Sequence, residues 1–190
     1  MKKVTLFLIL ALISFTVSET YADDFRKTKW GMSQNEVLAS ETLKPSEQTP
    51  EMIIYQNRVI NKKVLIGYRF IQDKLYSAGY VLQEEHSHSH HFILDYKDFK
   101  NALTSKYGKP ESDKEIWRSE YYKKTDALHK GWAISVGNLS YLSQWKTENT
   151  EICLILHGDN MKVNCGMTYI SEKFKYLKEQ KDIQQNRADF

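Results

Sequence analysis

Hydrophobic residues recur along this chain with two different periods, and the change between them predicts its secondary structure. Three segments with the two-residue period and the β-branched and aromatic content of strands follow one another, separated by polar pairs suited to tight turns. We predict an antiparallel meander from them. Its strands are Met52–Ile60, Lys63–Ile71 and Lys74–Leu82.

The helical period replaces the strand period after this meander. One apolar stripe at helical spacing predicts a long helix that ends at Gly108, a residue type common just past a helix end. A capping box at Ser33 and Glu36 predicts a short helix from Gln34 to about Glu41. The stripe of the long helix consists of Phe92, Tyr96, Phe99, Leu103 and Tyr107.

Strand-like segments return in the second half of the chain. They follow a charged loop, residues 111–130, in which Ile116 and Trp117 suggest a short strand. The final residues, 171–190, combine many charges with Phe174 and Leu177, which predicts a helix and a frayed tail. The four predicted strands are Trp132–Gly137, Leu139–Lys146, Glu151–His157 and Met161–Ile170.

The order of elements is therefore helix, three strands, helix, four strands, helix. This order predicts an α+β fold with a twisted antiparallel sheet of about seven strands and helices on one face. We expect a single domain at residues 23–175, whose two halves, about 23–85 and 86–175, repeat the same order of elements. Residues 176–190 form the predicted charged tail.

The first 22 residues have the pattern of a secretory signal peptide. Lys2 and Lys3 precede the apolar run Val4–Val17, and small residues lead up to Ala22. The run is shorter than a membrane-spanning helix requires. No cysteine lies near the expected cleavage point, which disfavours a lipid anchor. We expect the mature chain to begin near Asp23, to be periplasmic or secreted, and to have no stable membrane insertion.

Charge and motif content exclude several function classes. The leader holds two lysines and one glutamate, so 27 basic and 24 acidic residues become 25 and 23, a net charge of +2. This balance predicts no binding to nucleic acid or to anionic membranes. The sequence contains neither a G-x-S-x-G nucleophile elbow nor a glycine-rich phosphate loop. We therefore predict a protein that is not an enzyme.

Several short motifs resemble those of an uncharacterised group of bacterial secreted proteins. They are FRKTKWGMSQNEV (residues 25–37), ALTSKYGKP (102–110), Trp117 and GWAIS (131–135). More distantly, GMSQNEV before a meander is similar to small outer-membrane assembly lipoproteins and β-lactamase-inhibitor-like domains, although the lipidated cysteine of the lipoproteins is missing. The resemblance implies a binding or assembly module. Fold analogy alone does not assign a function.

The histidine cluster at EEHSHSHHF is the one group of residues with the composition of a metal site. His86, His88 and His90 share a face in an extended segment, and His86 and His90 lie one turn apart in a helix, so imidazoles could converge on Zn or Cu. The alternating serines and flanking glutamates also suit an exposed turn that leads into the helix. Both interpretations stay open. The candidate ligands are His86, His88, His90 and His91.

The two cysteines are predicted to form a disulfide. An exported protein folds in an oxidising compartment, and a hairpin centred on Asp159 would place Cys153 opposite Cys165. A two-residue turn at Gly158-Asp159 would shift the register and put the sulfurs on opposite faces. A soft-metal site that includes His157 is the less favoured alternative, because copper sites use two histidines.

Taken together, these patterns predict an exported envelope protein that binds or assembles and does not catalyse. Its expected partner is an envelope protein or a small ligand, and it needs no cofactor. The alternative is a transition-metal-binding protein that uses the histidine cluster.

Overall fold

A computed structural model describes residues 23–188 of the protein. The predicted signal peptide at residues 1–22 lies outside the described residues. The described helices are α1 (Gln34–Ser40), α2 (His90–Tyr107), α3 (Glu120–Asp126), α4 (Lys130–Ser135) and α5 (Lys175–Ala188), with a 3-10 turn, η1 (Ala127–His129), between α3 and α4. The strands are β1 (Glu47–Thr49), β2 (Met52–Val59), β3 (Lys62–Ile71), β4 (Lys74–Leu82), β5 (Ser112–Trp117), β6 (Leu139–Lys146), β7 (Thr150–Asp159) and β8 (Lys162–Ser171).

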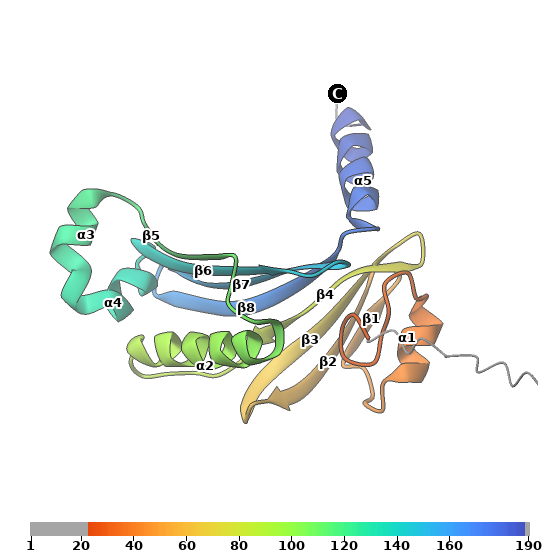
Figure 1. The fold of residues 1–190 in the computed structure, drawn as a ribbon, viewed down its shortest axis with the longest axis horizontal. Coiled ribbons are helices and arrows are strands. Elements are labelled where there is room, and N and C mark those ends of the chain that lie inside the picture. Colours follow the sequence, from red (N-terminus) through yellow and green to blue (C-terminus); the bar gives the residue numbers. More distant parts are fainter. Residues whose placement is uncertain (1–22, 189–190) are drawn as a thin grey trace, which may run out of the picture.

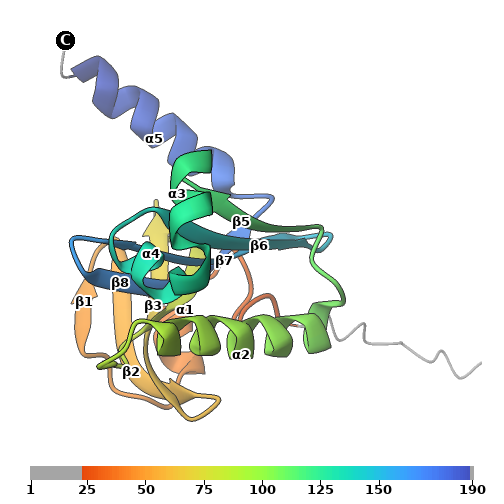
Figure 2. The same ribbon diagram turned by 90° about the vertical axis from the view of Figure 1, so that its left-hand side faces the viewer.

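The predicted α+β class with an antiparallel sheet is confirmed. The sheet has eight strands, rather than about seven, in the order β1-β2-β3-β4-β8-β7-β6-β5. Each half of the chain thus contributes a four-stranded meander, and β4 pairs with β8 where the two meanders meet. Helices α1 and α2 lie on one side of the sheet, whereas α5 rises from the other side (Figure 1). Figure 2 shows α2 beneath the strands and α5 pointing away above them.

Local signals explain the start and end of the predicted helices. The hydroxyl of Ser33 accepts from the amide of Glu36, and the Glu36 carboxylate accepts from the amide of Ser33, which confirms the capping box. Helix α2 ends before Gly108, which has a φ of 82°. The buried face of α2 includes Tyr96, whose hydroxyl lies 2.6 Å from that of Ser143 in β6.

Two-residue turns connect the strands of the first meander. Asn61 and Asp73 have positive φ, as do the residues before them, a conformation that matches the twist of a hairpin. Strands β2, β3 and β4 agree with the predicted segments within about two residues. The side chains that alternate toward α2 form the core, which includes Tyr55, Ile66 and Tyr68.

The second half departs from the prediction at two places. Residues 132–137 were expected to form a strand, but residues 130–135 form α4, because a short apolar run fits a buried helix as well as a strand. A Cβ on Gly131 would lie 2.7 Å from the backbone nitrogen of His90, so α4 packs closely against the start of α2. Two strands lie outside the predicted seven: β1, in a segment expected to be a loop, and β5 (Ser112–Trp117), which contains the short strand suggested at Ile116 and Trp117.

A buried ion pair fastens the N-terminal segment to the sheet. Arg26 donates to both carboxylate oxygens of Glu41, at 2.7 and 3.1 Å, and the hydroxyl of Tyr68 donates to the same carboxylate. Burial opposes ionisation of Glu41, but the hydrogen bonds from Arg26 and Tyr68 outweigh it and hold the pKa of Glu41 below its usual value. The same contacts keep Arg26 charged.

Candidate functional site

The sheet face opposite α2 carries the clearest candidate site. Along β7 the side chains alternate, so that Leu154 and Leu156 are buried against the helices while Ile155 and His157 are exposed on the other side. We call this second side the open face; Arg69, Val81 and Thr168 also lie on it by their register with β7.

Three glycines form the floor of a groove in the open face. Gly67 in β3 pairs with Gly79 in β4, and Gly166 in β8 lies one row further along, opposite Val81. A Cβ at Gly79 would lie 2.3 Å from the carbonyl oxygen of Met167, so only glycine lets β4 and β8 approach this closely. A Cβ at Gly67 would meet nothing within 4 Å.

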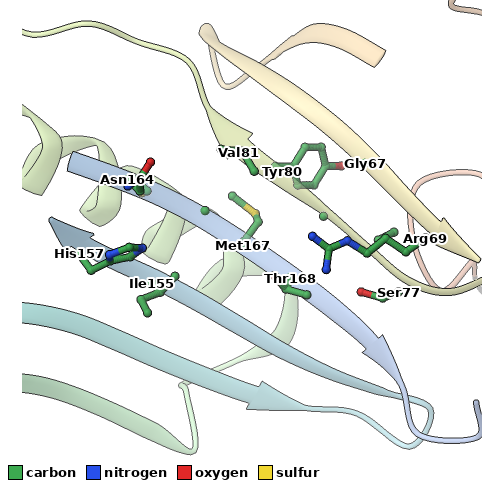
Figure 3. A pocket seen from close by; sticks show the side chains of 14 residues that line it. Gly67, Arg69, Ser77, Tyr80, Val81, Ile155, His157, Asn164, Met167 and Thr168 are labelled. Atoms are coloured by element: carbon green, nitrogen blue, oxygen red, sulfur yellow. The ribbon is translucent and has the colours of Figure 1, made fainter. Parts of the chain in front are cut away.

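This hollow, which we call the glycine groove, has apolar walls. Val81 and Ile155 stand on either side of Gly166 and keep 46% and 37% of their surface exposed. The volume of the groove is about 240 Å³. Figure 3 shows the lining side chains arranged along β3, β4, β8 and β7. The groove therefore crosses the β4–β8 pairing, where the two halves of the protein meet.

Polar side chains stand at both ends of the glycine groove. Arg69, Ser77 and Thr168 lie toward one end, and Figure 3 shows the guanidinium of Arg69 directed into the groove. His157 and Asn164, which are cross-strand partners, mark the other end. None of these five side chains makes a hydrogen bond or ion pair with another described residue. Their polar groups are free to meet a ligand.

The groove combines apolar walls with a few polar side chains, and His157 is the one histidine among the described residues that line it. A general base or nucleophile needs a partner that orients or activates it, and the described residues give His157 no such partner. Cys153, also on the open face, has a pKa raised by burial, so its thiol stays protonated. Apolar walls with a few convergent polar groups are typical of a recognition site.

The predicted metal ligands do not line this groove; His86 and His88 precede α2, and His90 and His91 lie in its first turn. Nε2 of His86 lies 2.5 Å from Oδ2 of Asp95, a carboxylate that also accepts from Nζ of Lys62 at 2.6 Å. His88, His90 and His91 are exposed. No group of three or more His, Cys, Asp or Glu side chains within residues 23–188 is arranged to hold a metal ion.

The predicted register of the last hairpin is wrong. Its two-residue turn is Asn160-Met161, both with positive φ, and not a turn centred on Asp159. Cys153 consequently pairs with Thr168, whereas Cys165 pairs with Leu156. The two thiols are free and on opposite faces of the sheet, so the predicted bridge is absent.

A second exposed surface lies on the helical segment between β5 and β6, which consists of α3, η1 and α4. Tyr121, Leu128 and Trp132 expose 69%, 92% and 52% of their surface. The first half of the chain has no counterpart, because a short turn joins β1 to β2. These side chains protrude rather than line a hollow, so they offer a ligand fewer simultaneous contacts than the glycine groove does.

Sequence reasoning did not find the glycine groove. Its residues come from four strands and from both halves of the chain, so no local spacing brings Arg69 and Ile155 together. One signal was present: isolated glycines inside strand patterns mark places where a sheet bends or another chain approaches closely. Gly67, Gly79 and Gly166 are such glycines.

Comparisons with protein-family models, with curated proteins and with solved structures find no match for this chain. The resemblances drawn from its motifs therefore stay predictions. Within residues 23–188, no helix combines the length and apolar character needed to span a membrane.

Proposed function

We propose that this protein is a non-enzymatic binding module of the bacterial envelope, and that its glycine groove takes up an extended segment of another polypeptide. The observation that carries the proposal is the glycine floor of the groove beside the exposed side chains of Val81 and Ile155. A folded monomer gains little by leaving such a surface uncovered. A partner that covers it would bury the apolar walls and satisfy the unpaired polar groups at the two ends.

The dimensions of the groove favour a polypeptide over an enclosed small molecule. Pockets that enclose ligands have volumes of about 300–1,000 Å³, and the groove is smaller, about 240 Å³. It is also long: Ser77, at one end, pairs with Ile170, which is six residues along β8 from Asn164 at the other end, a span of about 20 Å of extended chain. A segment of about six residues would lie along it with one side against the glycines.

The experiment that tests this proposal uses protein that begins at Asp23 and a heptapeptide library displayed on phage. Gly67→Val fills the groove without a clash, because a Cβ there meets nothing within 4 Å. Valine also suits a strand interior better than glycine does. We expect wild-type protein to select peptides with a shared apolar pattern. The Gly67→Val variant should not bind these peptides.

The matched control places the same side chain outside the groove. Gln144 lies on the open face in β6 and is exposed, so Gln144→Val adds a valine to the same face. This variant should bind the selected peptides as wild type does. Equal binding by Gly67→Val and wild type, or no selection by wild type, would contradict the proposal.

One observation favours a second candidate function, the binding of a transition metal. The ring centroid of His91 lies 5.4 Å from that of His86 and 6.1 Å from that of His88. Imidazoles that share an ion have similar separations, since each nitrogen lies about 2 Å from the metal. Asp95 would act as the carboxylate that orients a ligating His86. The exposed rings of His88 and His91 would have to turn toward the ion.

Calorimetric titration of tag-free protein with Zn²⁺ and Cu²⁺ tests this second function. The double variant His88→Ala/His91→Ala removes two exposed side chains and should abolish binding with no change in thermal stability. His157→Ala, also exposed, is the control and should bind as wild type does. Metal binding that persists in the double variant would rule out the cluster.

A further inference from the structure

We propose that Arg69, Ser77 and Thr168 form a carboxylate-binding subsite, which holds an acidic side chain or the C-terminus of the segment bound in the glycine groove. This inference rests on the proposed polypeptide-binding function and specifies the chemistry of the bound segment. It is carried by one unpaired cation, by a hydroxyl that lines the groove without a partner in the described residues, and by the apolar walls beside them.

Arg69 is the source of charge in this subsite. It is exposed in β3, and its guanidinium points into the groove (Figure 3). No carboxylate in residues 23–188 forms an ion pair with it. An arginine next to apolar walls is well suited to a carboxylate, because its planar guanidinium donates two parallel hydrogen bonds to the two oxygens.

Neighbouring charges leave the subsite with a single positive charge. Lys178, Lys181 and Asp182 of α5 line an adjoining hollow that Arg69 shares. Lys178 is paired with Asp182, and Lys181 with Glu51, so each lysine is already neutralised. One cation matches a carboxylate, whereas a phosphate dianion would be left with an excess of negative charge.

Ser77 provides the second, independent sign of a ligand. Only 4% of this residue is exposed, and its side chain lines the groove as the cross-strand neighbour of Arg69. Its hydroxyl makes no hydrogen bond with any described residue. The hydroxyl opens onto the groove, so its donor is available to a ligand that lies there. A carboxylate held by Arg69 would accept from this hydroxyl.

Thr168 completes the donors at this end. It is exposed, lies on the same face, and pairs with Gly79, one row along the sheet from Ser77. Val81 and Ile155 follow further along the groove. The subsite therefore predicts a bound segment with an acidic group at one end and apolar side chains beyond it.

The test measures whether the groove distinguishes a carboxylate from its neutral amide. Peptides selected on wild-type protein from the phage-displayed library are synthesised with Glu or Asp at the enriched position and with Gln or Asn instead. Their affinities are measured by fluorescence anisotropy. We expect wild type to prefer the acidic peptide by about tenfold or more, since charge-assisted hydrogen bonds are lost in the amide.

Three variants assign that preference to the subsite. Arg69→Gln should bind the acidic and the amide peptide equally, and Ser77→Ala should retain part of the preference. Lys63→Gln removes the same charge from the same strand and face, outside the groove, and should leave the preference intact. All three are checked for an unchanged far-ultraviolet spectrum and melting temperature.

The outcomes separate the subsite from the groove. Peptides that bind with no acidic preference, or a preference that survives in Arg69→Gln, would overturn the subsite and leave the binding function standing. If no peptide is selected, the groove function fails. Titration of the protein with decanoate, followed by nuclear magnetic resonance, then measures whether Arg69 binds a carboxylate. Arg69-dependent binding of decanoate would show that the site takes a free apolar acid and would overturn the polypeptide proposal. Absence of decanoate binding would overturn the subsite as well.

Discussion

Nε2 of His86 lies 2.5 Å from Oδ2 of Asp95, so the segment before α2 is tied to the first turns of that helix. The other oxygen of the same carboxylate accepts from Lys62, at the start of β3. Asp95 is buried, with 4% of its surface exposed. One carboxylate thus joins α2, the β2–β3 hairpin and the histidine segment.

Replacement of Asp95 by alanine should destabilise the fold. The change leaves Lys62, which is largely buried, without this partner, and loss of one member of a buried ion pair is costly. We expect the free energy of unfolding to fall by about 2–3 kcal/mol, since hydrogen bonds to charged groups contribute about this much. Urea denaturation followed by circular dichroism measures the change.

Asp98 offers a matched control on the same helix. Its carboxylate lies 2.9 Å from Nζ of Lys62, but the side chain is 54% exposed. Exposed ion pairs contribute little, so Asp98→Ala should cost less than about 1 kcal/mol. Equal losses for the two variants would contradict the role assigned to burial of Asp95.

Stability should fall with acid because of Glu41. Its pKa is lower in the folded protein than the ordinary value of 4.5, so the unfolded chain binds more protons in this range. The stability that Glu41 contributes is therefore complete above about pH 4.5 and is lost as the pH falls through the folded pKa. Urea denaturation at a series of pH values between 3 and 7 should show this slope.

Glu41→Gln identifies the source of the acid sensitivity. The variant should be less stable at pH 7 by about 2 kcal/mol, because Arg26 loses a charged acceptor in a buried site. Toward pH 3 the difference between variant and wild type should shrink. A constant difference over the whole pH range would show that Glu41 does not titrate as described.

Much of the fold was predictable because its signals are local. The capping box at Ser33, the helical stripe that ends at Gly108, and the polar turns of the first meander each involve residues close in the sequence. Such patterns determine the type of an element without reference to the rest of the chain. The long helix and three of the strands follow from them.

The parts that were not predicted depend on distant residues. Nothing near Trp132 distinguishes a strand from the helix that packs on α2. The turn at Asn160-Met161 places a methionine at positive φ, which residue preferences do not anticipate. The glycine groove arises only when β4 of one half pairs with β8 of the other. Tertiary pairing, rather than propensity, determines each of these features.

Both cysteines should be present as free thiols in the folded protein. Burial raises the pKa of Cys165 to about 12, and it raises that of Cys153 as well. Cys153 is half-buried on the open face, whereas Cys165 is 1% exposed. A thiol reagent should therefore modify Cys153 slowly and Cys165 only after unfolding. Mass spectrometry after alkylation in denaturant, without reductant, should find two modified thiols.

The variant Cys153→Ser identifies the reactive thiol. It should lose the slow reaction of the native protein and keep the reaction that requires unfolding. Protein exported to an oxidising compartment and found with no alkylatable thiol would contradict the register of β7 and β8, since that register places the two sulfurs on opposite faces.

The glycines of the groove should differ in their tolerance of a methyl group. Alanine at Gly67 places its Cβ in open space and removes flexibility from the unfolded chain, so the free energy of unfolding should rise by about 0.5 kcal/mol. Alanine at Gly79 places its Cβ 2.3 Å from the carbonyl oxygen of Met167, and this clash involves backbone that cannot move without separating β4 from β8. Gly79→Ala should therefore cost about 2–3 kcal/mol, as overpacked sites do. Thermal and urea denaturation of the two variants measure the contrast, and similar stabilities for both would mean that β4 and β8 do not approach each other as described.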